Sequence, residues 1–181
     1  TNKRSVLESL EKNQLDFALV STLPTHLKIE KIKLMPNKLL LVGGREAPII
    51  ESLYTTEAKK ATYIYREEGS ATRQIMEQVL KPNKNGFSKK IQLKSNEAVK
   101  QAVVAGLGYS IMPLIGLKNE LQNGNVKVMP IDELPIVTHW HLIWLKEKRF
   151  SPAAQRFLEY IQQNKESITK NKFNWFNDYK V

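Results

Sequence analysis

Apolar and polar positions follow two different spacings along this chain, and the two spacings alternate. Apolar residues that recur every three or four positions are typical of helices, and apolar residues that alternate or run together are typical of strands. Predicted helices cover residues 5–13, 55–60, 74–80, 98–105, 115–123 and 151–161. Predicted strands cover residues 16–20, 27–35, 39–42, 61–65, 91–93, 109–112, 126–131 and 137–145. Because strands and helices alternate, we expect mostly parallel sheets with helices on both faces.

Glycine, serine and proline predict where several of these elements begin and end. Gly43 and Gly44 are expected to end the strand over 39–42, and Gly106 is expected to end the helix over 98–105. Ser151 is expected to cap the last helix, with proline in its first turn. The remainder, residues 165–181, is polar with a small aromatic cluster, and residues 82–86 predict a loop.

Length and composition set the class of protein. The 181 residues are enough for one ordinary domain or for two small lobes, and 41% hydrophobic with 25% charged residues is typical of a chain with a packed core. The sequence contains no cysteine, which excludes disulfides and thiolate metal sites. It has no apolar run of the ~20 residues that a membrane span needs and no visible signal peptide, so we expect a cytoplasmic protein with no membrane partner. The chain lacks an initiator Met, so a signal carried upstream would not be visible.

The net charge of +10 comes from 28 Lys+Arg against 18 Asp+Glu, and it favours anionic partners. The positive residues are mostly lysines, and they are scattered along the chain without interleaved aromatic residues. Examples are Lys28, Lys31, Lys33, Lys38, Lys81, Lys84, Lys89, Lys90 and Lys94. This pattern is typical of a solvated surface. Direct nucleic-acid binding by this segment is the less favoured alternative.

Four polar junctions follow predicted strands or precede predicted helices, at residues 20–22, 68–72, 94–96 and 112–113. Ligands of open α/β sheets sit beyond the carboxyl ends of strands, and a helix N-terminus favours a carboxylate or a phosphate. Ser70 and Thr72 add hydroxyl donors, Arg73 is suited to a bidentate pair with an anion, and Ser95 and Asn96 have the same positions at the next helix. The alternative is that these side chains only cap helices.

Other motifs give weaker indications of chemistry. The Gly106-Leu-Gly108 segment follows a helix, whereas a dinucleotide-binding loop follows a strand, so it is interpreted as a helix end and turn. His139 and His141 share a strand face, but no third metal ligand stands at matching spacing, and ordinary packing is favoured. Glu67 and Glu68 are interpreted as solvated or ion-paired, not as an acid/base pair. With no catalytic grouping apparent, we expect a binding protein that holds no cofactor and no metal.

Four segments together resemble a known family. Residues 7–20, 67–73, 94–113 and 150–158 are similar to the effector-binding domain of LysR-type transcriptional regulators. The most specific segment is 94–113, Lys-Ser-Asn-Glu-Ala-Val-Lys-Gln-Ala-Val-Val-Ala-Gly-Leu-Gly-Tyr-Ser-Ile-Met-Pro, and the similarity extends over residues 5–163. The sequence of residues 66–73 is most similar to the matching segment in regulators of carbon-fixation operons.

The resemblance implies an α/β fold of two Rossmann-like lobes with a hinge, similar to type 2 periplasmic binding proteins. Lobe I would comprise residues 1–43 and 136–181, and lobe II residues 44–135. The family's effector domain begins with a strand, a helix and a second strand ahead of the position of Thr1, so this resemblance implies an N-terminally truncated lobe I. A small organic anion would bind between the lobes. The candidate ligand-binding residues are Ser21, Thr22, Glu67, Ser70, Thr72, Arg73, Ser95 and Asn96.

The resemblance also implies a sensor and not an enzyme. DNA would be contacted only through a helix-turn-helix domain that is absent from this chain, and the full-length regulator would be a homodimer or homotetramer. Two alternatives stay open at this point. One is an extracytoplasmic solute-binding protein of similar fold, and the other is a doubly wound enzyme such as a transferase.

Overall fold

The computed structural model describes residues 2–80 and 89–179, and the chain divides into two compact units. Unit 1 comprises Thr1–Asn37 and Thr138–Lys180, and unit 2 comprises Lys38–Val137. The predicted loop over 82–86, with Lys81 and Lys84, lies outside the described residues.

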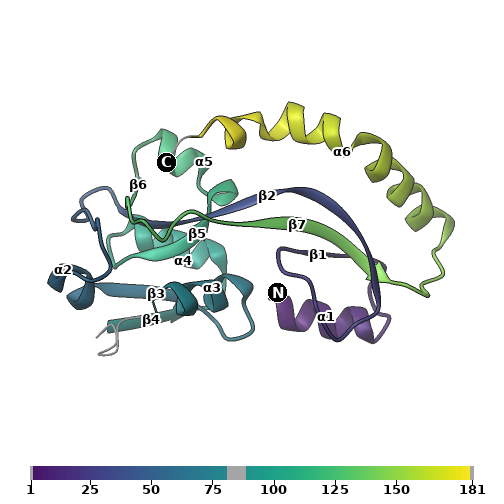
Figure 1. The fold of residues 1–181 in the computed structure, drawn as a ribbon, viewed down its shortest axis with the longest axis horizontal. Helices are drawn as coiled ribbons and strands as arrows, with labels where there is room; N and C mark the ends of the chain where they lie inside the picture. Colours follow the sequence, from purple (N-terminus) through teal and green to yellow (C-terminus); the bar gives the residue numbers. More distant parts are fainter. Residues whose placement is uncertain (1, 81–88, 180–181) are drawn as a thin grey trace. The chain divides into compact units, whose positions relative to one another are not determined.

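Unit 1 is built around a small antiparallel layer. Strand β1 (Ala18–Val20) pairs antiparallel with β7 (Ile136–Leu145), and β7 lies next to the first part of β2 (Ile29–Gly44). Helix α1 (Lys3–Glu11) lies against β1 (Figure 1). Helix α1 begins two residues earlier than predicted, and a capping box stabilises its start: the Asn2 side chain accepts a hydrogen bond from the Ser5 N–H at 3.1 Å and the Ser5 hydroxyl accepts one from the Asn2 N–H.

Helix α6 (Pro152–Asp178) completes unit 1 and is longer than predicted. The Ser151 hydroxyl accepts a hydrogen bond from the Ala154 N–H at 3.2 Å, which confirms the predicted N-cap. Leu158 and Ile161 of α6 pack with Ile32 and Leu142. No element was predicted for residues 165–181, but the lysine- and glutamate-containing segment after residue 161 has good intrinsic helix propensity and continues the helix, with a kink at Phe173.

Unit 2 contains one parallel strand pair and one antiparallel group. Strands β3 (Thr62–Arg66) and β4 (Lys89–Leu93) are parallel, whereas β5 (Ser110–Pro113) and β6 (Val126–Val128) pair antiparallel with the end of β2. The expectation of mostly parallel sheets is therefore wrong for the described strands. The antiparallel pairs β1–β7, β2–β5 and β2–β6 join strands that are distant in sequence, and the alternation of strands and helices along the chain does not show which strands pair or in which direction.

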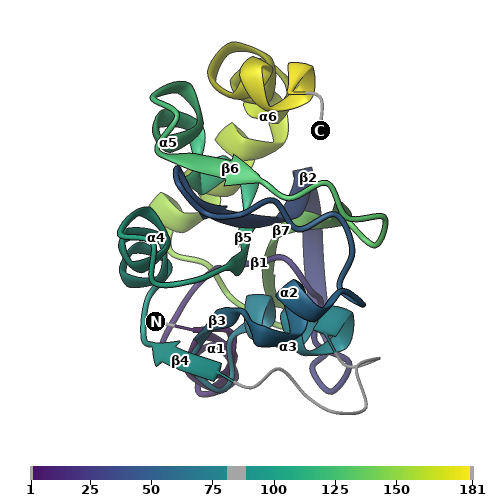
Figure 2. The same ribbon diagram turned by 90° about the vertical axis from the view of Figure 1, so that its left-hand side faces the viewer.

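Helices cover both faces of the β3 layer (Figure 2). Tyr63 and Tyr65 of β3 pack with Ile75 and Met76 of α3 (Ala71–Leu80). Side chains alternate along a strand, so Ile64 points to the opposite face, and α4 (Asn96–Val104) also contacts β3 and β5. The remaining helices of unit 2 are α2 (Thr56–Lys60), the 3₁₀ helix η1 (Leu114–Gly116) and α5 (Lys118–Gln122).

Strand β2 includes the two glycines that were expected to end it, and Gly44 is its last residue. Gly43 and Gly44 pair with Lys127 and Val126 of β6. A Cβ on Gly44 would lie 2.6 Å from the Val103 carbonyl oxygen, which is too close for any side chain. These glycines therefore permit close backbone approach, and both still pair with β6 before the strand ends.

Candidate functional site

The candidate site of unit 2 is the edge at which the parallel strands β3 and β4 end, here called the β3–β4 edge. In register, Arg66 at the end of β3 lies opposite Leu93 at the end of β4. Helix α3 begins at Ala71 after the first strand, and α4 begins at Asn96 after the second. The first-turn N–H groups of a helix have no partner within the helix, so both helix starts offer hydrogen-bond donors at one edge.

Arg66 organises the β3–β4 edge, and sequence reasoning did not select it. Its side chain is only 8% exposed. The guanidinium donates to both carboxylate oxygens of Glu67, from Nε at 2.8 Å and from Nη2 at 3.0 Å, and Nη1 donates to Asn96 Oδ1. The available signal was its position as the first charged residue after the apolar part of β3, where a buried charge needs a partner.

This arrangement brings two of the candidate residues, Glu67 and Asn96, together through one arginine. The Arg66–Glu67 fork neutralises the buried charge and fixes both side chains. Because Asn96 accepts from Arg66 through Oδ1, its amide NH₂ group retains donor capacity. The edge therefore combines a neutral ion pair, an amide donor and two helix N-termini, which together suit a small ligand with acidic and hydroxyl groups.

The other candidates of unit 2 have different surroundings. Ser70 is buried directly before α3, and its carbonyl oxygen accepts from the Gln74 N–H at 3.2 Å. Thr72 is half-buried in the first turn of α3. The Ser95 hydroxyl accepts from the Ala98 N–H at 3.0 Å, which is the capping role weighed as the alternative.

Arg73 is already engaged within unit 2. Its Nε donates to Glu77 Oε1 at 2.7 Å, and its Nη1 donates to Gln92 Oε1 at 2.5 Å and to the Arg66 carbonyl oxygen at 3.3 Å. These contacts tie α3 to β3 and β4. An anion that paired with Arg73 would have to compete with them.

In unit 1, Ser21 and Thr22 follow the end of β1 and are both half-buried. The Thr22 hydroxyl oxygen is buried and has no hydrogen-bond partner among the described residues. A buried hydroxyl of this kind is costly unless a water or a ligand completes its hydrogen bonds. Of the two candidates in unit 1, Thr22 is therefore the one whose hydroxyl most requires a hydrogen bond from a water or a ligand.

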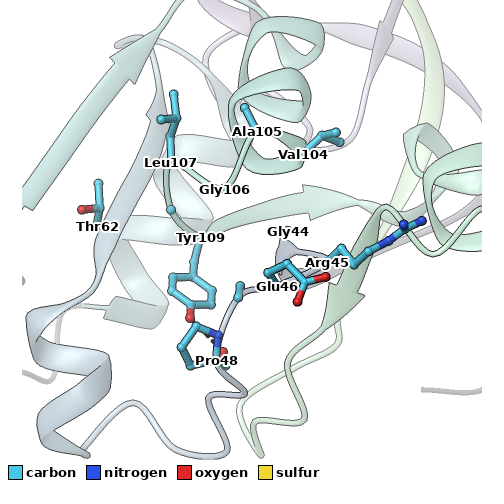
Figure 3. A pocket seen from close by; sticks show the side chains of 12 residues that line it. Gly44, Arg45, Glu46, Pro48, Thr62, Val104, Ala105, Gly106, Leu107 and Tyr109 are labelled. Carbon is cyan, nitrogen blue, oxygen red and sulfur yellow. Dashed lines mark hydrogen bonds between the residues drawn. The ribbon is translucent and has the colours of Figure 1, made fainter.

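A pocket of about 390 Å³ lies at the opposite end of β3, next to Thr62 (Figure 3). Its polar groups are largely satisfied within unit 2. The Arg45 guanidinium donates to the carbonyl oxygens of Asn123 at 2.8 Å and Gly124 at 2.9 Å, and the Tyr109 hydroxyl donates to the Pro48 carbonyl oxygen at 2.8 Å. Gly106, with a φ of 76°, ends α4 here, which confirms its interpretation as a helix end.

His139 and His141 lie two residues apart on β7. The ring centroids of His139 and His141 are 6.5 Å apart, and no cluster of three or more potential ligands occurs among residues 2–80 and 89–179. Burial lowers the pKa of His141, and the charges of Lys31, His139 and Lys33 lower it further, whereas a hydrogen bond with the His139 main chain opposes them. None of the described helices combines the length and apolarity that a membrane crossing requires.

The chain is similar to curated regulators of transcription. The model of the family described as "LysR substrate binding domain" matches residues 1–166. The HTH-type transcriptional activator CmpR of Synechocystis is 32% identical over 170 residues, which cover 93% of this chain and 56% of that protein. The RuBisCO operon transcriptional regulator of Allochromatium vinosum is 32% identical over 163 residues, covering 89% of this chain and 54% of that protein. The chain thus spans about half the length of these relatives.

Solved regulatory domains have the same fold. The Synechocystis PCC6803 CcmR regulatory domain in complex with 2-PG superimposes with a TM-score of 0.80 and 27% identity, over 95% of this chain and 82% of that chain. The regulatory domain of HypT from Salmonella typhimurium has a TM-score of 0.78 at 17% identity, over 92% and 80% of the respective chains. The predicted fold class, an α/β fold of the type 2 periplasmic-binding-protein kind, is confirmed. These relatives are regulators, which favours a regulator over a solute-binding protein.

Proposed function

This chain belongs to the LysR substrate binding domain family, and from that membership we propose that it is the effector-sensing part of a LysR-type regulator of transcription. It binds a small organic anion without transforming it, so it is not an enzyme. The curated relatives are transcriptional regulators, and DNA contact belongs to a helix-turn-helix domain outside this chain. On the same grounds we infer that the protein acts in the cytoplasm, as a homodimer or homotetramer when full-length.

The observation that carries this proposal is the convergence of two helix N-termini on the β3–β4 edge, with Arg66 holding Glu67 and Asn96 between them. Helix starts favour negative charge, and the Glu67 carboxylate can accept from a ligand hydroxyl. No covalent step is needed for such a group to be recognised. Thr72, in the first turn of α3, adds a hydroxyl beside the first-turn N–H groups.

We propose a small acid with a phosphate or a carboxylate as the effector. The CcmR regulatory domain, 27% identical to this chain, was solved in complex with 2-PG, so 2-PG is the first compound to test. The similarity to RuBisCO operon regulators supports the carbon-fixation subgroup.

We further propose that units 1 and 2 are the two lobes of the effector domain, which we expect at residues 1–43 with 136–181 and at 44–135. Ser21 and Thr22 would then contribute effector contacts from lobe I, in addition to those from the β3–β4 edge. Binding to both lobes would favour one arrangement of the lobes over another. A coupling of about 1–3 kcal/mol is typical of such switches.

The test is calorimetric titration of 2-PG into the wild-type chain and into Thr72→Ala. We expect the substitution to weaken binding by about ten- to a hundredfold, since a lost hydrogen bond to a charged group is worth roughly 1.5–3 kcal/mol. Thr56→Ala is the matched control, because Thr56 lies in the first turn of α2, away from the β3–β4 edge. Equal affinities of wild type and Thr72→Ala, with both chains folded by circular dichroism, would remove Thr72 from the site. A wild-type chain that binds neither 2-PG nor any other small acid contradicts the proposed function.

A further inference from the structure

A second cavity, of about 550 Å³, is lined entirely by residues of unit 1, and none of the candidate effector residues lines it. Strands β2 and β7 contribute one wall and α6 contributes the other. The cavity is lined by Lys33, Leu34, Pro36, His139, Lys165, Glu166, Thr169, Lys170 and Asn174. Its volume is within the range of small-molecule sites, about 300–1,000 Å³.

The charge of this lining is strongly unbalanced. Three lysines, Lys33, Lys165 and Lys170, stand against the single carboxylate of Glu166, which leaves two positive charges in excess. Among residues 2–80 and 89–179, none of these four side chains forms an ion pair. Lysines that converge from a strand and a helix without a carboxylate partner create a positive potential inside a concave surface, where field lines are focused.

The lining also contains groups that can orient a ligand. Leu34 and Pro36 supply apolar surface, and the Asn174 amide supplies donors and an acceptor. The Thr169 hydroxyl donates to the Lys165 carbonyl oxygen at 2.7 Å, so its oxygen remains an acceptor. This mixture is typical of a site for a small molecule, whereas a nucleic-acid surface presents an extended basic stripe.

The strand wall has a second indication of positive potential. Lys31 and Lys33 both lower the pKa of His141, on the same strand as His139. Lys31 and Lys33 are two residues apart on β2, so they share one face of the strand and their charges add there.

We propose that this cavity of unit 1 binds a small polyanion, with phosphate or clustered carboxylate groups held by Lys33, Lys165 and Lys170. The site is separate from the proposed effector site and does not depend on it. Because α6 supplies two of the three lysines, an anion here fastens α6 to β2 and β7.

The test uses inorganic pyrophosphate as the probe, with calorimetry and amide-shift NMR on the whole chain at low and at physiological salt. The key variants are Lys170→Glu and Lys172→Glu. Both place the same charge change on the same exposed stretch of α6, but only Lys170 lines the cavity. We expect Lys170→Glu to weaken binding at least tenfold and Lys172→Glu to weaken it less than twofold, with shifts in amides of residues 33–36, 139 and 165–174.

The inference is overturned if pyrophosphate does not bind, or if Lys170→Glu and Lys172→Glu lose the same affinity for it. It is also overturned if the amide shifts are confined to the β3–β4 edge. Binding of random-sequence duplex DNA through Lys170, without binding of pyrophosphate, would assign the lysines to nucleic acid instead. The Thr72→Ala variant separates the two proposals. It is expected to lose affinity for 2-PG while keeping the pyrophosphate response of residues 165–174. Failure of one proposal therefore leaves the other intact.

Discussion

At the residue scale, Arg66 shows how a buried charge can prepare a binding edge. Its fork to Glu67 and its bond to Asn96 occupy the guanidinium, so the charge is neutralised before any ligand arrives. Breaking such a pair by removing one partner leaves a buried charge uncompensated. We therefore expect substitutions of Arg66 to affect folding, and Asn96 is the better position for testing the chemistry of the edge.

Asn96→Asp is expected to change stability and ligand affinity in opposite directions. A carboxylate in the first turn of α4 is favoured by the helix dipole, by about 0.3–1 kcal/mol, and can accept from Arg66. It also repels an anionic ligand at the β3–β4 edge and lacks the amide donors. Thermal unfolding is expected to show an equal or higher Tm, and titration of 2-PG is expected to show weaker binding. Unchanged affinity would mean that Asn96 does not face the ligand.

His141 gives the chain an acid-sensitive position. Burial lowers the pKa of His141 from its usual value of about 6.5, and the charges of Lys31, His139 and Lys33 lower it further. The imidazole therefore binds a proton less readily in the folded chain than in the unfolded chain. Stability therefore rises with pH through this window and falls as the pH drops below about 6.5. His141→Gln removes the titrating group, so its unfolding free energy is expected to vary less between pH 7 and pH 5. Parallel pH profiles for both chains would contradict this account.

The candidate site could be predicted only in part from the sequence. The order of strand, polar junction and helix places residues 67–73 and 94–96 at one edge, because β3 and β4 are parallel. The order of these elements along the chain does not show which side chains form hydrogen bonds or ion pairs with one another. The sequence therefore did not reveal that Arg73 is engaged by Glu77 and Gln92, nor that Arg66 is the central cation.

At the element scale, glycine was the least reliable guide. Gly106 ends α4 as predicted, because its φ of 76° suits the residue after a helix. Gly44 is instead the last residue of β2, and its missing side chain admits the Val103 carbonyl oxygen. Local sequence cannot separate these two uses, since the second depends on α4, which is distant in sequence. The far half of α6 was missed for a related reason, because its polar residues gave no apolar spacing to follow.

Gly108→Ala is expected to destabilise unit 2 by about 1–3 kcal/mol, the usual cost of a strained backbone position. Gly108 has a φ of 155°, and a Cβ there would lie 2.3 Å from the Thr62 carbonyl oxygen, at the start of β3. Gly116→Ala is the matched control, because nothing lies within 4 Å of its Cβ position. Denaturant unfolding is expected to separate the two variants. Equal midpoints would show that β3 and the turn before β5 adjust without cost.

At the scale of the whole molecule, hydrogen exchange can separate the two proposed anion sites. If the effector contacts both lobes, 2-PG at about 100 times its Kd adds roughly 2.7 kcal/mol to the stability of the binding-competent state. Slower exchange is then expected in both units. Pyrophosphate in the second cavity is expected to slow exchange only in unit 1, around β2, β7 and α6. Protection by 2-PG limited to residues 38–137 would confine the effector to unit 2 and contradict the two-lobe proposal.

The division of the chain has a consequence for its synthesis. Unit 2 is one continuous stretch, Lys38–Val137, whereas unit 1 is assembled from segments on both sides of it. During translation every residue of unit 2 is added to the chain before α6 and most of β7, and domains generally fold as units in the order of their synthesis. Strand β1 therefore cannot pair with β7 until more than a hundred further residues have been added to the chain.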